Sequence, residues 1–84
     1  MTKPLPEFRA DAQEAMQLIL YEIYSGNKTS PAISEETGIP EQTVRRHINK
    51  LVDSGYVMAL TAIQRRKRAQ LWLTKKGFKT ISED

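Results

Sequence analysis

The chain has 84 residues, with 13 lysines and arginines against ten aspartates and glutamates, so its net charge is +3. This length predicts one domain with a thin core. The absence of cysteine excludes disulfides, thiolate metal sites and cysteine nucleophiles. No apolar run reaches the roughly 18 residues that span a bilayer, and the N-terminus carries no apolar signal segment. We therefore expect a cytoplasmic protein with no membrane partner, of bacterial, phage or plasmid origin.

The charges are unevenly distributed along the chain. Residues 1–40 carry three basic and six acidic side chains, whereas residues 41–84 carry ten basic and four acidic ones. A chain with an acidic half and a basic half has a preferred face for a polyanion such as nucleic acid. The alternative is a solvated surface whose charge is uneven without consequence.

The first part of the chain predicts an arm and then a helix. Residues 1–8 contain two prolines and are predicted to be a flexible N-terminal arm, and residues 9–84 form the domain. Residues 9–25 are predicted to be helical because apolar side chains recur at spacings of three and four. Tyr21 and Tyr24 lie off this stripe, so they are packing residues or part of a protein contact.

Two further helices follow, separated by a short turn. Ser30 is the expected N-cap of a helix over residues 31–37, which begins with a proline. Gly38 ends that helix, and residues 40–54 form the next one, which ends at glycine. The sequence between the two helices is Gly-Ile-Pro, which is typical of a helix-turn-helix.

The last third of the chain predicts a β-hairpin. Strands are expected over residues 56–62 and 70–74, with a basic loop between them. Trp72 is expected on the face of the strand opposite its two leucine neighbours. It is interpreted as a core residue or a cap on the sheet, and the alternative is a role in base stacking or in contact with a partner. A closing segment after the second strand is expected to cover the core through Phe78 and Ile81.

At this point the sequence resembles a known family. Residues 30–57 resemble the bacterial winged-helix regulators of the MarR and IclR types, and residues 73–77 resemble the segment that follows the wing in MarR-like proteins. The resemblance covers about residues 12–78. It implies an α+β winged helix-turn-helix fold, with three helices followed by a two-stranded β-hairpin wing. It also implies a recognition helix at residues 40–54 in the major groove and a basic wing at residues 63–69 on the DNA backbone or minor groove.

The candidate DNA-binding residues lie on the polar side of the recognition helix and at the tip of the wing. Arginine pairs with guanine in the major groove, and asparagine and glutamine pair with adenine. Of the two adjacent arginines, we favour Arg46 for base contact because it lies on the side of the other amides. His47 is a packing or hydrogen-bonding residue or a phosphate contact. The recognition-helix candidates are Gln42, Thr43, Arg45, Arg46, Asn49 and Lys50, and the wing candidates are Arg65, Arg66, Lys67 and Arg68.

The expected function is sequence-specific binding of double-stranded DNA by a small transcriptional regulator, acting as a repressor and as a homodimer. MarR regulators dimerise through long helices outside the DNA-binding core, and IclR regulators carry an effector domain. Neither is present in these 84 residues, so no small-molecule ligand is expected. Ser34, Ser54 and His47 form no plausible catalytic set, and one histidine without cysteine is a poor zinc site, so we expect no enzyme activity, cofactor or metal. The alternatives are a winged-helix protein–protein adaptor and an accessory DNA-binding factor in replication or recombination.

Overall fold

The computed structural model describes residues 5, 8–60 and 70–82. The predicted wing tip, residues 65–68, lies outside the described residues. The elements within the described part are α1 (Ala10–Ser25), α2 (Ser30–Thr37), α3 (Glu41–Asp53), β1 (Val57–Leu60), β2 (Gln70–Leu73) and α4 (Lys75–Ser82).

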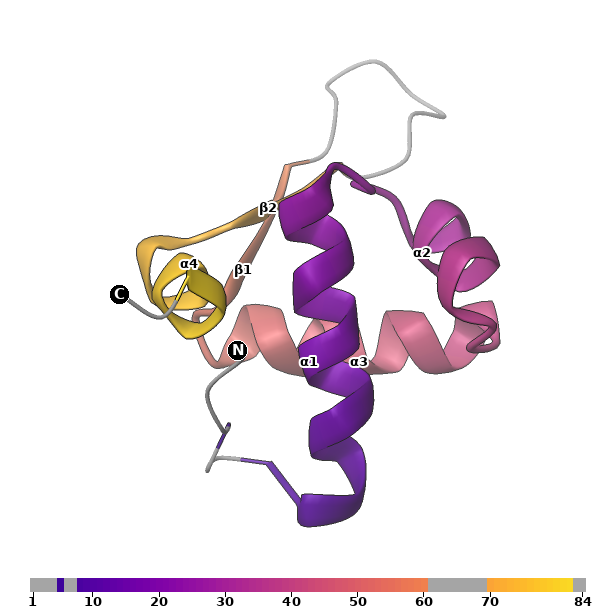
Figure 1. Ribbon diagram of the computed structural model, residues 1–84, viewed down its shortest axis with the longest axis horizontal. Coiled ribbons are helices and arrows are strands. Elements are labelled where there is room, and N and C mark those ends of the chain that lie inside the picture. Colours follow the sequence, from indigo (N-terminus) through magenta and orange to yellow (C-terminus); the bar gives the residue numbers. More distant parts are fainter. Residues whose placement is uncertain (1–4, 6–7, 61–69, 83–84) are drawn as a thin grey trace.

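The predicted winged helix-turn-helix architecture is confirmed. Figure 1 shows α1 standing across α3, with α2 on one side of α1 and the hairpin and α4 on the other. The strands β1 and β2 pair antiparallel, with Val57 opposite Leu73 and Ala59 opposite Leu71. Among the described helices, none is both long and apolar enough to cross a membrane.

The helix α4 is a difference from the prediction, which gave only a closing segment there. Its first turn is capped by Thr74, whose hydroxyl accepts a hydrogen bond from the backbone N–H of Gly77 at 3.1 Å. The N-cap of α2 also differs, because Thr29 rather than Ser30 accepts the bond from the Ala32 N–H. In both helices the N-cap residue is a threonine, which is common at this position.

The core is built around α1, whose buried stripe matches the predicted apolar spacing. Ile33 of α2 and one face of α3 pack against this stripe, and the hairpin and α4 close it with Leu71 and Ile81. Ile81 is therefore buried as predicted. The stripe of α1 consists of Met16, Ile19, Leu20 and Ile23.

Two residues of the predicted N-terminal arm, Leu5 and Phe8, are described, and both pack against the core. Leu5 is fully buried in the core, and Phe8 packs against it with its ring 6.0 Å from that of Tyr56. The side chain of Gln13 accepts a hydrogen bond from the Leu5 N–H and donates one to the Phe8 carbonyl. Burying a leucine fully contributes about 1.5–3 kcal/mol to stability.

Two aromatic side chains predicted to cover the core or the sheet lie elsewhere. Phe78 is 49% exposed, with its ring 5.8 Å from that of Tyr24. Trp72 is 37% exposed on the outer face of the hairpin, opposite Met58, and the ammonium group of Lys28 lies 4.0 Å from the centre of its ring. Neither ring belongs to the buried core cluster, in which Tyr56 is the aromatic member.

The end of the chain is fastened to the turn between α3 and β1. The hydroxyl of Thr74 donates to the Gly55 carbonyl at 2.5 Å, and the ammonium group of Lys76 donates to the Ser54 carbonyl at 2.9 Å. A Cβ atom added to Gly77 would lie 2.1 Å from the carbonyl oxygen of Tyr56. This close approach requires glycine and fixes α4 against the base of the hairpin.

We expect Gly77→Ala to lower the free energy of unfolding by at least about 3 kcal/mol, because the new methyl group overlaps backbone atoms. Chemical denaturation measures this effect. The matched control is Gly38→Ala, where a Cβ meets nothing within 4 Å and only the positive φ of 80° is strained, at about 1 kcal/mol. Equal losses for the two variants would contradict the proposed close packing.

Candidate nucleic-acid interface

The helix α3 has two faces of opposite chemistry. Val44, Ile48 and Leu51 are buried against the core. Five of the six predicted recognition residues are exposed, and Thr43 is partly buried. The exposed five are Gln42, Arg45, Arg46, Asn49 and Lys50.

The turn between α2 and α3 is held by hydrogen bonds that fix the angle of α3. The hydroxyl of Ser34 donates to the Ile39 carbonyl at 2.6 Å, and the Ile39 N–H donates to the hydroxyl of Thr37 at 3.2 Å. Gly38 adopts the left-handed conformation with φ 80°, and its N–H donates to the Ser34 carbonyl. The buried Ile33 completes the contact, so α2 supports the helix that carries the exposed cations.

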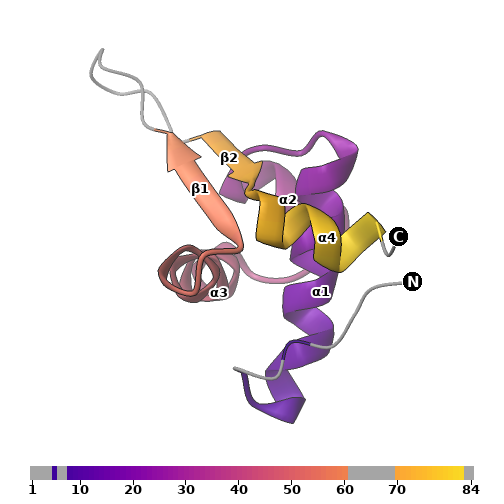
Figure 2. The same cartoon turned by 90° about the vertical axis from the view of Figure 1, so that its left-hand side faces the viewer.

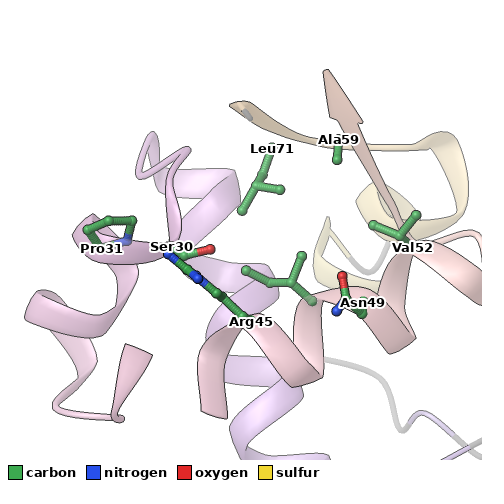
Figure 3. A pocket seen from close by; sticks show the side chains of 8 residues that line it. Ser30, Pro31, Arg45, Asn49, Val52, Ala59 and Leu71 are labelled. Atoms are coloured by element: carbon green, nitrogen blue, oxygen red, sulfur yellow. The ribbon is translucent and has the colours of Figure 1, made fainter. Parts of the chain in front are cut away.

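A groove of about 360 Å³ lies between α2, α3 and the hairpin (Figure 3). Its lining combines polar side chains with aliphatic ones. Sequence reasoning missed it, because it joins three segments far apart in the chain. The prediction that no small molecule binds takes no account of this groove, whose volume falls within the range of ligand pockets. It is lined by Ser30, Pro31, Arg45, Ile48, Asn49, Val52, Ala59 and Leu71.

The two adjacent arginines of α3 have different surroundings. Arg45 lines the groove and forms an ion pair with Glu41, one helical turn earlier, at 2.7 Å between Nη2 and Oε2. Such an exposed pair contributes about 0.3–0.5 kcal/mol to a helix. Arg46 is exposed, is not among the residues that line the groove, and makes no ion pair with another described residue. Glu41 was not among the predicted site residues, although its spacing of four from Arg45 was a visible signal.

The hairpin rises from the same side of the molecule as α3. Figure 2 shows α3 and β1 together on one side, with α1 and α4 on the other. The strand β1 ends at Leu60, and β2 begins at Gln70. The segment between them contains the predicted wing residues. The start of β1 therefore lies next to α3, and the hairpin extends away from this helix toward the predicted wing residues (Figure 2).

His47 lies at the edge between the two faces of α3. It is partly buried, and its Nδ1 atom is buried without a hydrogen-bond partner among the described residues. Burial lowers the pKa of this imidazole below its ordinary value, and the positive charges of Lys50 and Arg46 lower it further. The predicted packing role agrees with these surroundings, whereas the predicted alternative of a hydrogen bond finds no described partner for Nδ1.

A patch of exposed aromatic rings lies on α1 and α4, and we call it the aromatic patch. The rings of Tyr21 and Tyr24 are 6.3 Å apart, and Phe78 of α4 contacts Tyr24. All three residues are about half exposed. The patch contains no residue of α3.

Comparison with protein-family models finds one that matches the central half of the chain. A family model described as winged helix-turn-helix DNA-binding matches residues 17–58, which contain α2 and α3. Among the curated proteins, none matches the chain in sequence.

Solved structures of MarR proteins share the fold. A MarR family regulator from Neisseria meningitidis has a TM-score of 0.74 and 26% identity, over 87% of this chain and 52% of that one. The structure of Streptococcus pneumoniae FabT in complex with DNA has a TM-score of 0.65 and 29% identity, over 77% of this chain and 46% of that one. The structure of Staphylococcus aureus MarR in complex with salicylate and kanamycin has a TM-score of 0.69 and 24% identity, over 79% of this chain and 45% of that one. The chain therefore spans about half the length of the structures it matches.

The lowered pKa of His47 predicts a dependence of stability on pH. The unfolded chain takes up a proton near pH 6.5, and the folded chain does so only at a lower pH. The folded state therefore loses stability relative to the unfolded state as the pH falls through this window, and the full contribution is present above it. Unfolding titrations of the wild type and of His47→Gln measure the effect, and identical pH profiles for the two proteins would contradict it.

Proposed function

Because the chain belongs to the winged helix-turn-helix DNA-binding family, we propose that it binds double-stranded DNA sequence-specifically and represses transcription in the bacterial cytoplasm. The observation that carries the proposal is the exposed polar and basic face of α3, which no other described element covers. The structural similarity to FabT, which was solved in complex with DNA, also supports it.

In this proposal, α3 enters the major groove and Arg46 reads the bases. The planar guanidinium group of Arg46 pairs with guanine O6 and N7, and a good bidentate pair discriminates by about 1–3 kcal/mol. Gln42 and Asn49, exposed on the same side of α3, are suited to adenine. Thr43 contacts a phosphate or a thymine methyl group, and Lys50 contacts the backbone.

One DNA strand follows the groove between α2, α3 and the hairpin. Ser30 and Arg45 in its lining are suited to phosphate, and the aliphatic side chains of the lining are suited to the sugars. Residues 65–68 contribute four cations to the neighbouring backbone or to a narrow minor groove.

Binding as a homodimer is part of the same proposal. A single recognition helix reads few base pairs, whereas two copies on half-sites about one helical turn apart read a longer operator. The aromatic patch supports this idea, because exposed apolar patches on small domains mark interaction surfaces. Pairing through α1 and α4 is compatible with a free α3.

We expect binding to mixed duplex fragments to weaken steeply with salt, at a slope of log affinity against log salt near −5 if about six phosphates are neutralised. Arg46→Ala should weaken binding to a selected operator by about tenfold or more and relax its base preference. Fluorescence anisotropy at several salt concentrations measures both effects.

The matched control is Lys79→Ala, which removes one positive charge from an exposed position on α4. This variant should bind the operator like the wild type. A wild-type protein whose affinity does not depend on salt would refute DNA binding. Equal effects of the two substitutions would refute the role of Arg46.

We expect Tyr24→Ser and Phe78→Ser each to weaken self-association by at least about tenfold, because aromatic residues at the centre of an interface dominate its energy. Analytical ultracentrifugation measures the dimer constant. Met58→Ser is the control, since Met58 is similarly exposed on the hairpin. A wild-type protein that stays monomeric at high concentration would refute the dimer.

A further inference from the structure

An acidic residue stands at the start of the cationic face of α3. Glu41 is the first residue of the helix, and no other acid occurs in α3 until Asp53 at its far end. Its side chain is 38% exposed. In a helix-turn-helix, the residues at the N-terminus of the recognition helix contact the base edges. Under the proposed function, a carboxylate therefore lies where the DNA approaches.

The carboxylate of Glu41 has one described partner, the guanidinium group of Arg45. The ion pair cancels much of the positive charge that Arg45 would present to a phosphate. A phosphate that binds Arg45 must either compete with Glu41 or lie close to a second negative charge. DNA of any sequence brings phosphates to this place, so Glu41 weakens binding that relies on the backbone alone.

The negative charge of Glu41 finds a hydrogen-bond donor only in some DNA sequences. In the major groove, a carboxylate accepts a hydrogen bond from the amino group of cytosine N4. A site with cytosine at the matching position offsets the repulsion, whereas other bases leave the carboxylate without a donor. Specificity is a difference between two affinities, and an unpaired charge against the wrong partner increases that difference.

We propose that Glu41 is a specificity-determining residue, which restrains Arg45 and disfavours DNA that lacks a cytosine amino group at the position it reads. The proposal rests on the function proposed above. A purely structural role for the pair is the alternative, and it makes a different prediction. An exposed ion pair of this kind adds little to helix stability. If the pair were purely structural, removing it would therefore leave the affinity for DNA unchanged.

The test compares the wild type with Glu41→Gln, which keeps the shape of the side chain and removes its charge. Binding to mixed duplex fragments and to the best site selected from random DNA is measured across a range of salt. We expect affinity for mixed DNA to rise about three- to tenfold and the salt slope to steepen by about one. The ratio of selected-site to mixed affinity should fall, and the preference for cytosine at one position should be lost.

The matched control is Glu14→Gln, which removes the same charge from an exposed position on α1. It should leave all four quantities unchanged. In an Arg45→Gln background, Glu41→Gln should have a smaller effect, because the restraint then has no target.

The outcomes separate the two proposals. Loss of salt-dependent DNA binding by the wild type itself would overturn the proposed function. Normal wild-type binding with an unchanged specificity ratio in Glu41→Gln would overturn only the role of Glu41. An effect of equal size in Glu14→Gln, or one retained in full without Arg45, would also overturn it.

Discussion

The burial of one face of α3 against α1 is the constraint on which the rest of the structure depends. Val44, Ile48 and Leu51 contact the core, and this fixes the rotation of the helix about its axis. Rotation by one residue would turn Arg45 into the core, where an unpaired charge is strongly disfavoured. The aliphatic contacts therefore decide which side chains face solvent, and the exposed cations follow from them.

The second constraint is the position of the hairpin relative to α3. It depends on close backbone contacts of β2 and α4: the Leu71 N–H in β2 donates to the Lys28 carbonyl, and Gly77 in α4 lies against the Tyr56 carbonyl. These contacts hold the hairpin over α3 and create the groove between them. Under the proposed function, the groove attracts the DNA backbone, and the carboxylate of Glu41 repels it. A surface of cations alone would bind every sequence with similar affinity.

Much of the fold was predictable because local signals agreed with the tertiary structure. The apolar spacing of α1, the glycines that end the helices and the two faces of α3 each identify an element without reference to the others. The missed features were not local. The eight-residue α4 contains a glycine and would be marginal alone, so it depends on its cap at Thr74 and its packing on the α3–β1 turn. The burial of Leu5 likewise depends on space that α1 and its neighbours leave open.

The sequence by itself determined that a helix-turn-helix precedes a β-hairpin, and that one side of the second helix of this pair carries the amides and cations. These properties follow from periodicity and composition over short stretches of chain. Only the tertiary structure decided that Arg45 and Asn49 share a groove with Ser30, Ala59 and Leu71, and that the aromatic rings of α1 and α4 meet. Such juxtapositions arise from packing between distant segments, which spacing along the chain does not encode.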